Sequence, residues 1–355
     1  MSNSTGRLAY APALDGLRAV ACLSVMLYHA GVIGGGFLGV DVFFTLSGFL
    51  ITSLLLGELR ADGAVDLRAF WRRRIFRIVP LLATVTLTLA VWGWAHGGTV
   101  GQATITGAVA SLLFVTNWVV SHGADGAGAL TANWSVALEE QFYLVWPLIL
   151  AGLFRLRRNE RALAVGVAAA AVVLSVHRLM IAPGATGARI WFGIDTQADA
   201  LLAGCAVALG LQCRSRRAAA VAGVGLAALL LFARENTFTY QFGLPATTLC
   251  TAVLLPTLAE RATGWLAWAP LRAVGRRSYG LYLWGSAVHF LAADVYGLAG
   301  AGLMLVVFPA TFLVTEVTYR LVEVPLRRLG RRPLRRSQAF STAPGGRRRR
   351  CPRRP

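Results

Sequence analysis

Apolar runs of about 18–22 residues recur along the whole chain and constrain its fold more than any other feature, because a helix of that length spans a bilayer. Only 14% of the residues are charged, whereas a soluble domain carries about 25%. We therefore expect an all-α integral membrane protein. The runs occupy approximately residues 17–33, 38–57, 76–96, 104–121, 135–154, 162–182, 194–213, 217–233, 243–260, 279–297 and 299–321.

The distribution of arginine tests how many of these runs span. Arginine clusters fall at residues 72–77, 155–161, 214–217, 272–277 and from 327 onward, and the intervening turns are nearly free of basic residues. Basic residues gather on the cytoplasmic side of membrane helices. All clusters fall on one side only if 104–121 does not span. We therefore predict about ten transmembrane helices, both termini cytoplasmic, and 104–121 as a re-entrant or interfacial segment on the outer face.

The net charge of +19 comes largely from the C-terminal end, where twelve arginines and no acidic residue lie between Arg327 and Arg354. Such a tail is typical of a topology and lipid-surface signal, so we expect a lipid bilayer and no nucleic acid as partner. We predict a membrane domain over 1–336 and a disordered basic cytoplasmic tail over 337–355, with no separate signal peptide. The five scattered cysteines show no metal-ligand spacing, and we expect no metal and no disulfide framework.

The stretch from Asp15 to Ile51 carries two ionisable residues in one apolar run, followed by the glycine hinge at 34–36. Arg18 and His29 are eleven positions apart, which places them on one helix face about 16 Å apart along the axis. Ionisable residues inside membrane helices mark functional sites by default. The pair predicts a long ligand that is polar at both ends, and the pattern alone leaves His29 either catalytic or a packing residue.

A second set of basic residues, Arg72, Arg73, Arg74 and Arg77, opens the run at 76–96. Positive-inside anchoring explains any such cluster. Arg74 and Arg77 also share a helix face, and two guanidinium forks on one face suit phosphate oxygens. Spacing alone does not choose between the two interpretations.

Acidic residues at membrane depth are the remaining candidates. Glu139 and Glu140 lie just inside the run at 135–154, as ion-pair partners of an arginine or as a catalytic or acceptor-orienting acid. Asp41 opens another run, where it suits the helix dipole. Asp195 and Asp199 share a face, and surface solvation is their simplest interpretation.

The other four histidines show no pattern in the sequence that indicates a functional site. His96 and His122 fall in predicted outer loops, and His177 and His289 lie on predicted helices with no convergent partner in the sequence.

Taken together, the motifs DGLRAVA, GGGFLGVDVFFTLSGFLIT, RRRIFRIVP, NWSVALEEQFYLVWP, DTQADALLAG, SYGLYLW and YRLVEVPLRR resemble acyltransferase family 3, over about Leu14 to Arg328. Members of this family O-acylate bacterial surface polysaccharides, peptidoglycan and some natural products. The resemblance implies ten helices in a bacterial plasma membrane and an acyl-CoA donor that enters from the cytoplasm. The positions that match family motifs are Arg18, His29, Arg74, Arg77, Trp134, Ser135, Glu139, Glu140, Tyr282, Trp284, Glu323 and Pro325.

Two positions depart from the family pattern. The family commonly has a histidine two residues before the tryptophan of WS and another just after YLW, where this chain has Ala132 and Gly285. His29 is then the only histidine that matches a motif.

These observations predict a membrane O-acyltransferase that transfers an acyl group, acetyl or short-chain, to a hydroxyl of a carbohydrate or natural product. Acyl-CoA would be a co-substrate, with no cofactor. We expect His29 as general base and Glu139 as the second catalytic residue. The expected substrate-binding residues are Arg18, Arg74, Arg77, Trp134, Ser135, Glu140 and Asp41. A transporter or flippase for an acyl group or glycolipid, and an inactive family member, are the alternatives.

Overall fold

The computed structural model describes residues 10–123, 126–156, 159–260 and 264–330, and it contains helices and connections with no strand in those ranges. The prediction of an all-helical chain is therefore confirmed. The predicted basic tail at 337–355 lies outside the described residues.

Six helical stretches of the described chain are long and apolar enough to cross a membrane. Each coincides with one of the predicted spans, which supports a multi-pass membrane protein. They are Gly36–Asp62, Leu67–His96, Gly128–Leu156, Glu160–Ile181, Thr239–Glu260 and Gly300–Gly330. The α-helices within them are α2 (Gly39–Asp62), α3 (Leu67–His96), α6 (Trp134–Leu156), α7 (Glu160–Ile181), α11 (Leu244–Glu260), α14 (Gly300–Thr318) and α15 (Val324–Gly330).

The other four predicted spans are helices that are shorter or more polar: α1 (Pro12–His29), α9 (Ile194–Ala208), α10 (Arg216–Phe232) and α13 (Ser278–Phe290). Apolar runs continue past the ends of these helices, because hydropathy does not register where a helix breaks. α1 begins five residues before its predicted start, with Pro12 in its first turn, where a missing backbone N–H costs nothing.

Short elements connect these helices. The short α-helices are α4 (Gly98–Leu112), α5 (Thr116–Ser121), α8 (Gly187–Phe192) and α12 (Ala269–Arg276). The 3₁₀ segments are η1 (Gly36–Leu38), η2 (Gly128–Asn133) and η4 (Trp265–Ala267), and the π segments are η3 (Thr239–Gly243), η5 (Leu291–Val295) and η6 (Tyr319–Glu323).

The segment predicted not to span, 104–121, is divided between α4 and α5, and it contributes no candidate span among the described residues. The helix breaks at Phe114, whose φ of 56° no continuous α-helix allows. After α5, the 3₁₀ segment η2 leads directly into α6.

The glycine hinge lies where predicted, between α1 and α2, and its last residue, Gly36, begins η1. The Gly34 amide donates to the Leu231 carbonyl at 3.2 Å. A Cβ on Gly35 would lie 1.9 Å from the Leu229 carbonyl oxygen. The hinge therefore packs directly on the end of α10, which no larger residue at position 35 allows.

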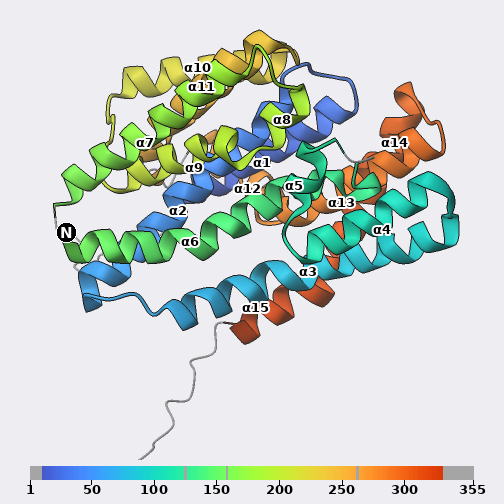
Figure 1. The fold of residues 1–355 in the computed structure, drawn as a ribbon, viewed down its shortest axis with the longest axis horizontal. Coiled ribbons are helices and arrows are strands. Elements are labelled where there is room, and N and C mark those ends of the chain that lie inside the picture. Colours follow the sequence, from blue (N-terminus) through green and yellow to red (C-terminus); the bar gives the residue numbers. More distant parts are fainter. Residues whose placement is uncertain (1–9, 124–125, 157–158, 261–263, 331–355) are drawn as a thin grey trace, which may run out of the picture.

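Most helices run along the longest axis of the molecule (Figure 1). Arg60 at the end of α2 pairs with Glu160 at the start of α7. Arg214, after α9, pairs with Glu260 at the end of α11 at 3.2 Å. Figure 1 places the α3–α4 turn at the opposite end, and this turn around Gly97 contains no arginine. All four side chains of the two ion pairs line one cavity, so the two pairs lie on the same side of the molecule.

Two helices far apart in the sequence, α1 and α13, lie side by side and in parallel. Arg18 Nε donates to Ser278 Oγ at 3.3 Å, and eleven residues further along both helices the rings of His29 and His289 have centroids 5.4 Å apart. About one turn before the Arg18–Ser278 contact, a Cβ on Gly275 of α12 would lie 1.8 Å from the Asp15 carbonyl oxygen. The face of α1 that carries Arg18 and His29 is therefore fixed against α13.

Candidate active site

A cavity of about 150 Å³ opens between α1, α2, α3, α6 and α13, and three arginines line it: Arg18, Arg74 and Arg77. Glu139 is the one carboxylate among its lining residues. Ser47 Oγ donates to Glu139 at 2.6 Å. Since three cations face one carboxylate, the cavity is suited to an anionic ligand.

Arg74 is held in place by its neighbours. Its Nε lies 3.6 Å from Glu140 Oε1, and its guanidinium stacks over the Tyr143 ring at 3.5 Å from the centroid. Burial restricts both charged side chains, which are 15% and 14% exposed. The ion-pair interpretation of Glu140 is therefore confirmed, and Arg74 is preorganised at the cavity wall.

Arg77, one helical turn further along α3, has no carboxylate within ion-pair distance among the residues that the structure describes. Three arginines (Arg18, Arg74 and Arg327) are near enough to act on it electrostatically, and they outnumber the two carboxylates, Glu140 and Glu323, that also do so. Bringing like charges together costs free energy unless an anion compensates them. This arrangement favours the phosphate interpretation of the cluster over simple anchoring.

His29 lies at a second, smaller cavity at the other end of the shared α1–α13 face. This cavity has a volume of about 10 Å³, and His289, Cys22 and Gly285 are among its lining residues. His29 itself is exposed at the end of α1. Contrary to expectation, His289 therefore has a convergent partner.

Tyr282 lines both cavities. Its hydroxyl donates to the Ala132 carbonyl at 2.9 Å and accepts from Ser135 Oγ at 2.8 Å. The backbone carbonyl at position 132 serves this contact whatever side chain the residue carries. Replacement of the family histidine by Ala132 therefore leaves the hydrogen bond of Tyr282 intact.

The structure does not bring every predicted site residue to these cavities. Glu139 is not among the residues that line the His29 cavity. Trp134 packs on Phe44 and Trp191 in an aromatic cluster. Asp41 lines neither cavity; it is 1% exposed. Its carboxylate oxygens are buried with no hydrogen-bond partner in the described structure.

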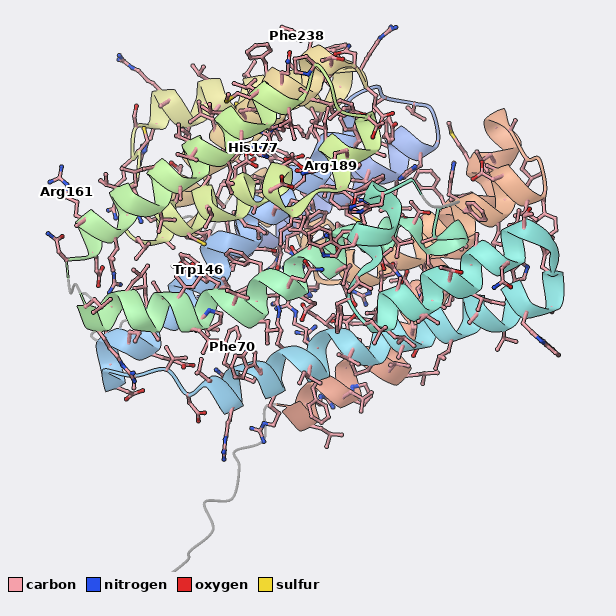
Figure 2. The ribbon with its side chains drawn as sticks, viewed as in Figure 1. Phe70, Trp146, Arg161, His177, Arg189 and Phe238 are labelled. Atoms are coloured by element: carbon pink, nitrogen blue, oxygen red, sulfur yellow. The ribbon has the colours of Figure 1, made fainter. Side chains whose placement is uncertain are left out.

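Further polar contacts were missed on the outer half of the bundle. Asp199 is buried and paired with the equally buried Arg178 at 2.7 Å, so surface solvation was the wrong interpretation. His177 bonds to Asp195 at 2.9 Å, and Arg189 binds the same carboxylate at 2.6 Å. Figure 2 shows His177 of α7 close to Arg189 of α8, and both far from Arg161 at the start of α7.

The signal that identifies His289 was present in the sequence. Position 289 follows Gly285 by four residues, and residues i and i+4 share a helix face. A histidine at 289 therefore points to the same side of α13 as the missing family histidine, one turn further along.

The described residues contain no group of three or more histidine, cysteine or acidic side chains that could hold a metal ion.

The fold and these cavities define a helical membrane protein with an arginine-lined cavity at one end of a helix pair and two imidazoles at the other. Residues 12–320 match the family described as acyltransferase domain. The chain belongs to this family.

The chain is also similar to curated bacterial proteins. It is 30% identical over 350 residues to the peptidoglycan O-acetyltransferase OatA of Listeria monocytogenes, which covers 90% of this chain and 56% of that protein. It is 33% identical over 369 residues to the putative peptidoglycan O-acetyltransferase YrhL of Bacillus subtilis, covering 95% of this chain and 58% of that protein. The O-acetyltransferase OatA of Staphylococcus aureus is 29% identical over 350 residues, covering 90% and 58%. The chain thus spans just over half the length of these relatives. No solved structure matches it.

Proposed function

We propose that this chain is a membrane O-acetyltransferase that moves an acetyl group from acetyl-CoA to a hydroxyl of a carbohydrate. The observation that carries the proposal is the guanidinium-lined cavity at one end of α1 and α13, with His29 at the other end. Family membership supports acyl transfer. The relatives named as peptidoglycan O-acetyltransferases favour an acetyl group and a glycan acceptor over a natural product.

In this proposal the cationic cavity holds the phosphates of the donor. Arg77, which lacks a carboxylate partner in the described structure, and the stacked Arg74 contact phosphate oxygens. Arg18 lies on the way to His29, about 16 Å along α1 at 1.5 Å per residue. A long donor with phosphates at one end and a thioester at the other matches this spacing.

The chemistry requires one general base. His29 accepts the proton of the acceptor hydroxyl while the hydroxyl oxygen attacks the thioester carbon. The new C–O bond forms, the C–S bond breaks, and His29 returns its proton to the departing thiolate. Glu139 belongs to the donor cavity in this scheme, and its role is to orient the donor through Ser47 rather than to orient His29.

The donor enters from the cytoplasm, because the helix ends rich in arginine lie on that side by the positive-inside rule. With α1, α9, α10 and α13 counted as spans, the chain crosses the bacterial plasma membrane ten times and both termini are cytoplasmic. The pairs Arg60–Glu160 and Arg214–Glu260, which join four helix ends on one side, support this arrangement.

The test is transfer from acetyl-CoA by the purified full chain in detergent, with a soluble N-acetylglucosamine oligosaccharide as acceptor probe and mass spectrometry of the product. We expect His29→Gln to lower the turnover about 10²–10⁴-fold, while acetyl-CoA still binds. The matched control is His96→Gln, at the outer end of α3 and stacked on Trp92. A His29→Gln protein that transfers at the wild-type rate excludes the general-base role, and one that no longer binds donor makes His29 a binding residue.

A further inference from the structure

Gly285 stands where the family commonly has a histidine after YLW. The structure instead places the imidazole of His289, one helical turn further along α13, beside His29. The rings of His29 and His289 have centroids 5.4 Å apart and are inclined by 41°. Gly285, which contributes no side chain, lines the same small cavity as both histidines. We propose that His289 is a second catalytic residue of this chain, which binds the acceptor hydroxyl together with His29.

The size of the cavity between the helices supports a single-oxygen site. Its volume is about 10 Å³, which approaches the space that one water-sized probe needs. Its remaining lining is largely apolar, with Val25, Met26, Leu281 and Val307. The other polar groups of the lining are already engaged. The Ser286 hydroxyl donates to the Tyr282 carbonyl at 3.0 Å, and the Cys22 thiol and the Tyr282 hydroxyl each donate to a backbone carbonyl. The two imidazoles therefore supply the unoccupied polar groups for an oxygen bound there.

The hydrogen-bonding capacity of a hydroxyl matches two imidazoles. A hydroxyl oxygen has one proton and two lone pairs, and a neutral imidazole has one N–H donor and one acceptor nitrogen. His29 accepts the hydroxyl proton and the N–H of His289 donates to one lone pair. The second lone pair remains free to attack the thioester carbon. No atom is transferred to or from His289, so the balance of the reaction is that given above.

The placement of His289 depends on the register of α1 and α13. Arg18 meets Ser278 at one end of the shared face and His29 meets His289 at the other. Both intervals are eleven residues, so one helix register fixes the two contacts. The arginine-lined cavity is thus separated from the histidine pair, and a change at His289 should leave donor binding unchanged.

This inference rests on the proposed acetyltransferase function, and three variants of equal charge test it. In His289→Leu the donor N–H is lost at similar volume, whereas His289→Gln keeps an N–H donor. His96→Leu is the control for replacing a histidine near the outer end of another helix. Each full-length protein is assayed in detergent with acetyl-CoA and the oligosaccharide probe, with release of free thiol and formation of acetylated product as readouts, and with its melting temperature measured.

We expect His289→Leu to lower kcat about 10²-fold, the loss typical of removing one positioned donor, with the KM for acetyl-CoA unchanged. His289→Gln should retain clearly more activity than His289→Leu, and His96→Leu should match the wild type. An active wild type with undiminished kcat in His289→Leu overturns the inference and leaves the proposed function standing. Equal loss in the Gln and Leu variants, or a parallel rise in donor KM, makes His289 structural. A folded wild type that neither transfers nor hydrolyses the thioester overturns the proposed function itself.

Discussion

Arg77 offers the cleanest test of donor binding, because its removal strands no buried carboxylate. Arg74→Ala would leave Glu140 without its partner in a site where that side chain is 14% exposed, and the variant would combine a binding loss with a folding loss. Arg77 has no such partner in the described structure, and Arg18 and Arg74 act on it as like charges. Arg77→Ala therefore breaks no ion pair of the described structure, and we expect the variant to fold.

The expected effect follows from the contact that would be lost. One charge-assisted hydrogen bond contributes about 1.5–3 kcal/mol, which corresponds to a rise in the KM for acetyl-CoA of about 10- to 150-fold. The kcat should stay within a few-fold, because Arg77 does not line the His29 cavity. Purified protein assayed over a range of acetyl-CoA concentrations gives both constants.

Arg68→Ala is the matched control, because it removes an equal charge from the same helix without stranding a carboxylate. Arg68 is exposed, has no carboxylate within ion-pair distance in the described structure, and does not line the cavity. If positive charge at this end of α3 only anchors the helix, the two variants should lose activity and protein amount alike.

Acetyl-pantetheine, which lacks the phosphates, completes a double-mutant cycle. Removing Arg77 and removing the phosphates should cost less together than the sum of the separate losses, because both remove the same contact. Equal loss with acetyl-CoA and with acetyl-pantetheine refutes the assignment of Arg77 to phosphate.

Two further predictions concern topology and packing. In a Cys351→Ser background, His122→Cys should react with an impermeant maleimide on intact cells, whereas the exposed native Cys213 should react only after permeabilisation; the reverse pattern contradicts the ten-span arrangement. Gly275→Ala should lower the melting temperature, because its Cβ would lie 1.8 Å from the Asp15 carbonyl oxygen and overpacking costs about 1–3 kcal/mol. Gly302→Ala, which has open space at its Cβ, is the control, and equal melting temperatures would disprove the close contact of α1 and α12.

Sequence spacing correctly predicted which residues share a face of a single continuous helix. Arg18 and His29 lie on one face because α1 is uninterrupted from Pro12 to His29. The limits of such reasoning appear at α13, where thirteen residues of α-helix pass into the π segment η5 inside a single apolar run. Hydropathy measures the run and not the hydrogen-bonding pattern, so four predicted spans proved shorter or more polar than a full crossing.

The sequence alone did not predict which helices, far apart in the chain, pack against each other. His289 contacts a residue 260 positions away, and only the packing of α13 on α1 brings the two rings together. The buried pair of Arg178 and Asp199 likewise depends on α7 lying beside α9. In contrast, the ion pair of Glu140 was one of the two alternatives that its depth in the membrane suggested, since a carboxylate there needs a partner.

The parallel register of α1 and α13 makes the backbone a ruler between the arginine cavity and the histidine pair. Side-chain substitutions can alter the affinity at the arginine cavity or at the histidine pair. They do not change the distance between these two sites, which the rise per residue of both helices sets. Adapting the enzyme to a donor with a shorter or longer arm would require removing or adding a turn, 5.4 Å, in α1 and α13 together. A change in one helix alone would separate Arg18 from Ser278 or His29 from His289. Donor length should therefore be harder to re-engineer than the choice of acyl group.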